Sequence, residues 1–98
     1  MIRPDILRRE NGIFLDFYDY GMDSKKDDFD EFVKFITEKL GISKTWTYET
    51  VFDDLEKFEF RGEVLTLGWD YGCFLKLPPD SKIDPEEIIE LCYGDDNA

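Results

Sequence analysis

The chain has 98 residues, of which 24 are Asp or Glu and 12 are Lys or Arg, histidine is absent, and the formal net charge is −12. This length predicts a single domain over residues 1–98, and a hydrophobic content of 42% suffices for one core without disulfides or metals. The charge argues against nucleic acid or a membrane surface as a partner and favours a cationic one, although an acidic surface also serves solubility.

Residues 6–18 are predicted to form a β-hairpin. Asn11-Gly12 is a preferred pair for the central positions of a tight type I′ turn, because both residues tolerate a positive φ. After the turn, apolar residues recur at every second position, which is the pattern of a strand with one buried face: Ile13, Leu15 and Phe17.

Residues 27–40 are predicted to form an amphipathic helix. Apolar residues recur at the spacing of one helical face: Phe29, Phe32, Val33, Ile36 and Leu40. Gly41 follows at the position where a helix commonly ends in a left-handed residue.

The middle of the chain is predicted to be strand. A short strand is expected within residues 44–52, where residues of high β propensity cluster. Three further runs, separated by turn signals, predict an antiparallel meander over residues 56–60, 63–68 and 73–77.

The last element is a short helix with a complete set of start signals. Asp84 is the expected N-cap, Pro85 takes the first helical position, and Glu87 is placed to complete a capping box. Ile83 and Ile88 have the spacing of a hydrophobic staple.

Together these elements predict an α+β fold, in which an antiparallel sheet made of the N-terminal hairpin and the C-terminal meander has two helices packed on one face. Cys73 and Cys92 match no metal-binding spacing and are expected to be buried free thiols. With no apolar signal segment near Met1, a cytoplasmic location is expected.

The sequence carries no recognisable catalytic set. Without histidine, the common acid–base and nucleophile systems cannot be assembled, and phosphate-binding glycine motifs are absent. Asp16, Asp19 and Asp23 do not fit the calcium-loop spacing, because tyrosines occupy ligand positions. We therefore expect a protein that is not an enzyme and uses no cofactor or metal; a small carboxylate-dependent or metal-dependent enzyme is the least favoured alternative.

Tyr and Trp residues cluster with acidic residues at predicted strand ends and loops. Such rings bury a large area with few rotatable bonds and keep a polar tip, so they are enriched at binding hot spots. The alternative is that each ring caps a sheet edge and buries its body in the core. The predicted partner-binding residues are Tyr18, Asp19, Tyr20, Asp23, Trp46, Tyr48, Asp53, Asp54, Trp69, Asp70 and Tyr71.

Two segments carry a resemblance to a known class of proteins. The run Phe60-Arg61-Gly62-Glu63-Val64-Leu65-Thr66-Leu67-Gly68-Trp69-Asp70 and the closing helix Pro85–Cys92, in a small acidic α+β chain, resemble the immunity proteins of bacterial contact-dependent growth inhibition and other polymorphic toxin systems. The resemblance assigns no role to a single residue. It implies tight binding to a cognate toxin domain, often a basic nuclease, by covering its active site or substrate surface.

The leading hypothesis is therefore an immunity-type inhibitor that binds a basic protein partner through an acidic, aromatic-containing surface. A nucleic-acid mimic and a generic acidic interaction domain are the alternatives. The mimic requires carboxylates spaced like phosphates along an extended face. The oligomeric state, the strand order and the identity of the partner do not follow from the sequence.

Overall fold

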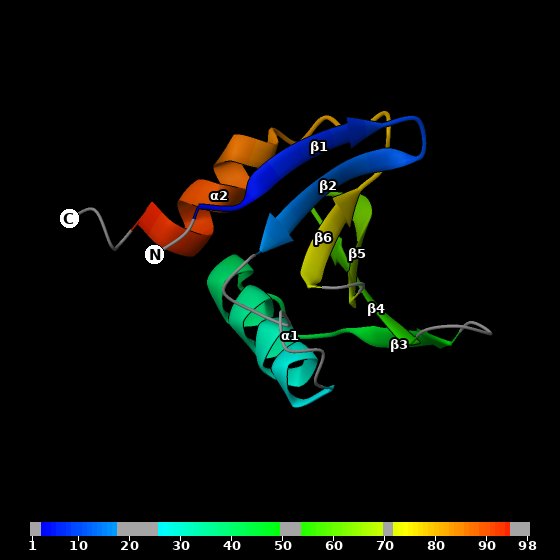
Figure 1. The fold of residues 1–98 in the computed structure, drawn as a ribbon, viewed down its shortest axis with the longest axis vertical. Coiled ribbons are helices and arrows are strands. Elements are labelled where there is room, and N and C mark those ends of the chain that lie inside the picture. Colours follow the sequence, from blue (N-terminus) through cyan, green and yellow to red (C-terminus); the bar gives the residue numbers. More distant parts are fainter. Residues whose placement is uncertain (1–2, 18–25, 50–53, 70–71, 95–98) are drawn as a thin grey trace.

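The computed structural model describes residues 3–17, 26–49, 54–69 and 72–94, and for Lys26, Asp27 and Asp54 it describes the backbone alone. Along the chain the order is β-β-α-β-β-β-β-α (Figure 1). The strands are β1 (Asp5–Arg9), β2 (Gly12–Phe17), β3 (Trp46–Glu49), β4 (Asp54–Phe60), β5 (Glu63–Trp69) and β6 (Cys73–Leu77), and the helices are α1 (Lys26–Leu40) and α2 (Pro85–Tyr93).

The described strands form one antiparallel sheet in the order β1-β2-β6-β5-β4-β3. The predicted α+β class is confirmed. Pairing of β2 with β6 joins the N-terminal hairpin to the meander of β4, β5 and β6. The strand expected within residues 44–52 is β3, which pairs with β4. β1 and β3 therefore form the two edges of the sheet.

Both helices pack on the same face of the curved sheet, as expected (Figure 1). The ring of Phe32 on α1 lies 5.0 Å from that of Phe17 on β2, and the ring of Phe35 lies 5.7 Å from that of Tyr93 on α2. Burying each large apolar side chain contributes roughly 1.5–3 kcal/mol. The fully buried side chains between sheet and helices include Leu15, Phe17, Phe32, Ile36, Phe58, Leu65, Leu67, Leu75, Leu77, Ile88 and Ile89.

Helix α1 ends as the sequence predicts. Gly41 adopts a φ of 70°. The N–H of Ile42 donates to the carbonyl of Thr37 at 2.8 Å, and the N–H of Gly41 donates to that of Glu38 at 3.4 Å. These two bonds form a Schellman motif, which satisfies carbonyls that the helix leaves open and directs the chain towards β3.

The turn between β1 and β2 differs from the prediction. The register pairs Arg9 with Gly12, so Glu10 and Asn11, not Asn11 and Gly12, are the two turn residues. Neither has a positive φ, so the turn is not type I′. Gly12 instead begins β2 with a φ of 157°, and a Cβ there would lie 2.7 Å from the carbonyl oxygen of Leu77. The positive-φ pair occurs between β4 and β5, at Arg61 (52°) and Gly62 (80°).

The start of α2 confirms most of the predicted signals. The carboxylate of Asp84 accepts a hydrogen bond from the N–H of Glu86 at 3.0 Å, and the staple residues Ile83 and Ile88 are both buried. The capping box is the exception, since the Glu87 carboxylate pairs with Arg61. Neither helix of the described chain has the length and apolar character needed to cross a bilayer.

Candidate protein-interaction surface

The register of the sheet assigns each side chain to one of two faces, because directly paired residues of antiparallel strands point the same way. One face packs against α1 and α2. The other, which we call the helix-free face, is covered by neither helix. From β1 to β3 it carries Asp5, Leu7, Arg9, Phe14, Asp16, Phe74, Lys76, Val64, Thr66, Gly68, Leu55, Lys57, Glu59, Trp46 and Tyr48.

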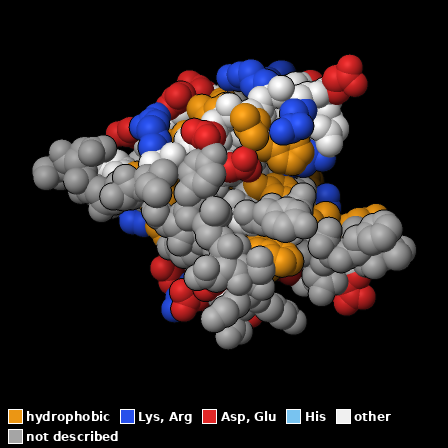
Figure 2. Space-filling model, in the orientation of Figure 1, with side chains coloured by type: hydrophobic (Ala, Val, Ile, Leu, Met, Phe, Trp, Pro, Cys, Tyr) orange, Lys and Arg blue, Asp and Glu red, His pale blue; other side chains and the backbone are white. Residues whose placement is uncertain are grey.

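Aromatic rings and lysines alternate across the centre of this face. The rings of Phe14 and Phe74 lie 5.6 Å apart in a tilted arrangement, and the ammonium of Lys76 lies 5.7 Å from the centre of the Phe14 ring. The Phe74 ring occupies the space over Gly68, where a Cβ would come within 2.3 Å of it. In the space-filling view, hydrophobic and Lys or Arg side chains lie together over β1, β2 and β6 (Figure 2).

At the β3 edge, two large aromatic side chains face solvent. Trp46 is 43% exposed and Tyr48 is 54% exposed. The ammonium of Lys57 on β4 lies 5.3 Å from the centre of the Tyr48 ring and donates a hydrogen bond to the Thr66 hydroxyl at 3.2 Å. A shallow hollow beside Trp46 is lined by Glu59 and by the segment 41–44 that follows α1. β3 is therefore an aromatic edge beside a shallow hollow.

The predicted partner-binding residues divide into four groups. Trp46 and Tyr48 lie side by side on the helix-free face. Trp69 lies on the opposite face of the sheet, partly buried against the core. Asp54 begins β4, with only its backbone described. The remaining predictions fall outside the described residues: Tyr18, Asp19, Tyr20, Asp23, Asp53, Asp70 and Tyr71.

Sequence reasoning missed Phe14, Leu55 and Phe74 as surface residues. A signal for two of them is present, because Phe14 and Phe74 stand out of phase in strands whose alternate positions are already apolar. An aromatic residue on the second phase of such a strand indicates that the second face is also apolar. Leu55 is also out of phase with the apolar residues of its strand, Phe58 and Phe60, but it shares its phase with the charged Lys57 and Glu59, so this signal is weaker.

Negative charge is concentrated in the helical layer. The described side chains of α1 include four carboxylates against Lys34 and Lys39, and α2 carries three carboxylates with no basic residue: Asp28, Asp30, Glu31, Glu38, Glu86, Glu87 and Glu90. The helix-free face carries both signs, with Arg9, Lys57 and Lys76 near Asp5, Asp16 and Glu59. Thus the helix-free face is locally mixed in charge, while the molecule as a whole is strongly negative.

Asp16 is the one carboxyl of the described residues whose pKa is clearly displaced. Partial burial raises its pKa, the directly paired Asp5 raises it further, and Arg9 acts in the opposite direction. Directly opposed like charges destabilise a strand pair. A cationic group placed next to these two carboxyls would relieve that repulsion.

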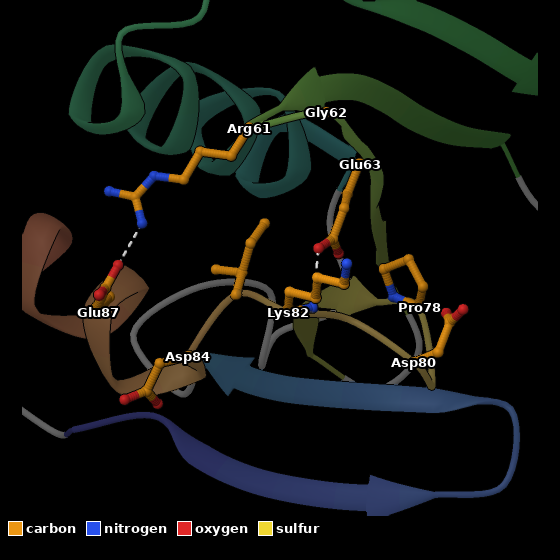
Figure 3. A pocket seen from close by; sticks show the side chains of 9 residues that line it. Arg61, Gly62, Glu63, Pro78, Asp80, Lys82, Asp84 and Glu87 are labelled. Atoms are coloured by element: carbon orange, nitrogen blue, oxygen red, sulfur yellow. Dashed lines mark hydrogen bonds and ion pairs between the residues drawn. The ribbon is translucent and has the colours of Figure 1, made fainter.

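A polar cleft lies between the β4–β5 turn and the start of α2 (Figure 3). Arg61 pairs with Glu87 across it, and Glu63 accepts hydrogen bonds from the Ser81 hydroxyl and from the N–H of Lys82, the latter at 2.9 Å. These groups are already satisfied by one another. We therefore assign the cleft a structural role, in which it ties the β4–β5 turn to α2.

The described residues offer little chemistry elsewhere. Within the described ranges, no group of three His, Cys, Asp or Glu side chains is arranged to hold a metal ion. Cys73 and Cys92 are free, buried thiols, and burial raises the pKa of each to about 12. Thiols with so high a pKa are poor nucleophiles. No protein-family model, curated protein or solved structure matches this chain.

Proposed function

We propose that this chain is an immunity-type protein that binds and neutralises a basic toxin domain by docking it on β3 and the adjoining helix-free face. The observation that carries the proposal is the exposed pair Trp46 and Tyr48 on an edge strand of a molecule with a net charge of −12. The sequence resemblance to immunity proteins supports the same class of partner.

The aromatic pair supports a role in holding the partner. Exposed Trp and Tyr side chains lose little conformational entropy on binding and dominate many interfaces. From β3 the apolar surface continues inward through Leu55, which is paired with Tyr48, and then through the rings of Phe74 and Phe14 on β6 and β2. A partner seated on β3 would therefore contact a continuous set of partly exposed apolar side chains.

The charge supports a basic partner and argues against a second copy of this chain. Two copies that each carry −12 repel one another, whereas the same field accelerates encounter with a cationic surface. The mimic hypothesis needs an unbroken row of carboxylates, but Lys34 and Lys39 interrupt those of α1. We therefore favour the toxin inhibitor over the nucleic-acid mimic.

The test uses the purified chain and the purified toxin domain encoded beside it. We expect a one-to-one complex, and protection of cells that express the toxin. Replacing both Trp46 and Tyr48 by alanine should weaken binding about 100-fold, since we expect the two hot-spot rings together to contribute about 2.8 kcal/mol. Calorimetric titration measures this loss.

The matched control is Leu91→Ala, which removes a 41% exposed apolar side chain from α2. This variant should bind as the wild type does. Absence of a complex, or equal losses from the β3 pair and from Leu91, would contradict the proposal.

A further inference from the structure

We infer that β3 binds its partner by accepting an extended segment as a seventh strand, and that this segment alternates basic with apolar side chains. The inference rests on the proposed function for the sign of the partner's charge. Within the described sheet β3 is the last strand and pairs with β4 alone. Its outer side therefore presents backbone N–H and C=O groups in the geometry that another strand can pair with.

Among the residues that the structure describes, no strand pairs with this outer side of β3. All four residues of β3 are exposed. The hydroxyl of Thr47, a residue of β3, donates a hydrogen bond to the carboxylate of Glu56 on the inner neighbour β4. That contact lies on the inner side of β3, towards β4.

The two sides of β3 differ in chemistry, and this difference specifies the partner. Trp46 and Tyr48 point to the helix-free face, whereas Thr47 and Glu49 point to the other, where Glu56 lies directly across from Thr47. Side chains of an added strand stand beside their cross-strand neighbours on the same face. One set of the partner's side chains would thus lie beside two aromatic rings, and the alternate set beside carboxylates.

A segment with valine or another apolar residue on one face and arginine or lysine on the other satisfies both sides. Apolar and β-branched side chains pack against aromatic cross-strand neighbours, and basic side chains pair with Glu49 and Glu56. Because β3 has four residues, the pairing covers about four residues of the partner. The occupant is therefore a short basic strand of another protein.

The probe for this inference is a six-residue peptide, blocked at both ends, in which arginine and valine alternate. It is titrated into the full chain labelled with ¹⁵N. Two controls have the same composition: one groups the three arginines before the three valines, and one keeps the alternation but is N-methylated at every residue. N-methylation removes the backbone donors that strand pairing requires and leaves the charge unchanged.

We expect the alternating peptide to bind and to shift the amide signals of residues 46–49, with those of β1 unchanged. Both controls should bind at least about tenfold more weakly, a difference of about 1.4 kcal/mol. Equal binding of the three peptides would show attraction by net charge alone and would overturn the inference. Shifts confined to the helices or β1, or no binding, would overturn it as well.

The outcome is separable from that of the proposed function, because the peptide experiment contains no toxin. If the toxin domain binds and the alternating peptide does not, the immunity function stands and strand addition at β3 is wrong. If the peptide binds as expected and the toxin domain does not, β3 accepts basic strands but the proposed function fails.

Discussion

Strands β1 and β3 are the two edges of one sheet, yet they meet their surroundings differently. β1 begins after the buried Pro4, which has no N–H to offer, and carries Arg8 and Arg9 in consecutive positions. The segment just before it is tied to α2, since Arg3 pairs with Glu86. β3 carries Trp46, Thr47, Tyr48 and a single charge at Glu49.

Proline and charged residues are devices by which natural sheets prevent unwanted pairing at an edge. β1 uses both, including Arg8 on the helix-covered side. β3 uses only its short length and Glu49. One edge of this sheet is therefore protected against partners, while the other combines exposed rings with outer backbone groups that no other described strand pairs with. We interpret the second edge as the one that functions in binding.

The largest expected effect on binding comes from placing a basic residue on β3, like those that β1 carries. Tyr48→Lys removes a ring and places a positive charge where we propose that a basic partner docks. The affinity for the toxin domain should fall about 100-fold, because a hot-spot ring is lost and like charges then oppose each other. Calorimetric titration measures this loss of affinity. Tyr48→Phe is the control and is expected to bind within about threefold of wild type. Equal losses in both variants would show that the hydroxyl, not the ring or the charge, determines binding.

A second prediction compares how tightly the two sides of the sheet are packed. Gly12, beside β1, would place a Cβ 2.7 Å from the carbonyl oxygen of Leu77, whereas Gly41, before β3, would meet no described atom within 4 Å. Gly12→Ala should lower the free energy of unfolding by about 2 kcal/mol through overpacking against backbone. Gly41→Ala should lower it by about 1 kcal/mol through its positive φ alone. Urea denaturation gives both values, and the reverse order would contradict this packing difference.

The smallest expected effect is electrostatic and concerns Asp16, which is paired with Asp5 of β1. The raised pKa of Asp16 means that the folded state binds this proton more tightly than the unfolded state does. Stability is therefore lost as pH rises from the ordinary value through the raised pKa. Asp16→Asn should be more stable than wild type at pH 7 by about 0.3 kcal/mol, because solvent screens this part-exposed carboxyl. Denaturation curves at pH 7 and pH 3 should show this advantage only at pH 7; an advantage of equal size at both would contradict the electrostatic cause.

Much of the fold was predictable because local signals agree with it. The stripe on α1, the staple on α2 and the alternation in β2 each point to the face that is buried. The order of the strands was not predictable, since pairing of β2 with β6 joins segments that lie far apart in the chain. The β1–β2 turn was misplaced by one residue, because Gly12 was interpreted through its tolerance of positive φ. Its tertiary role, close approach to Leu77, leaves no local signal.

The candidate surface was predictable only in part. Trp46 and Tyr48 were predicted as partner-binding because rings of this kind next to acidic residues favour interfaces, and the structure places both at the surface. The same reasoning could not separate them from Trp69, which the register turns toward the core. The direction of a side chain depends on the phase of its strand, and a single aromatic residue does not define that phase.

Docking at β3 is tested most directly by amide hydrogen exchange of the full chain, alone and in complex with the toxin domain that we propose as its partner. If the partner docks at β3, the amides of residues 46–49 become protected in the complex, while those of residues 5–9 of β1 exchange as they do in the free protein. Protection confined to α1, α2 or β1, with β3 exchanging at its free rate, would contradict it.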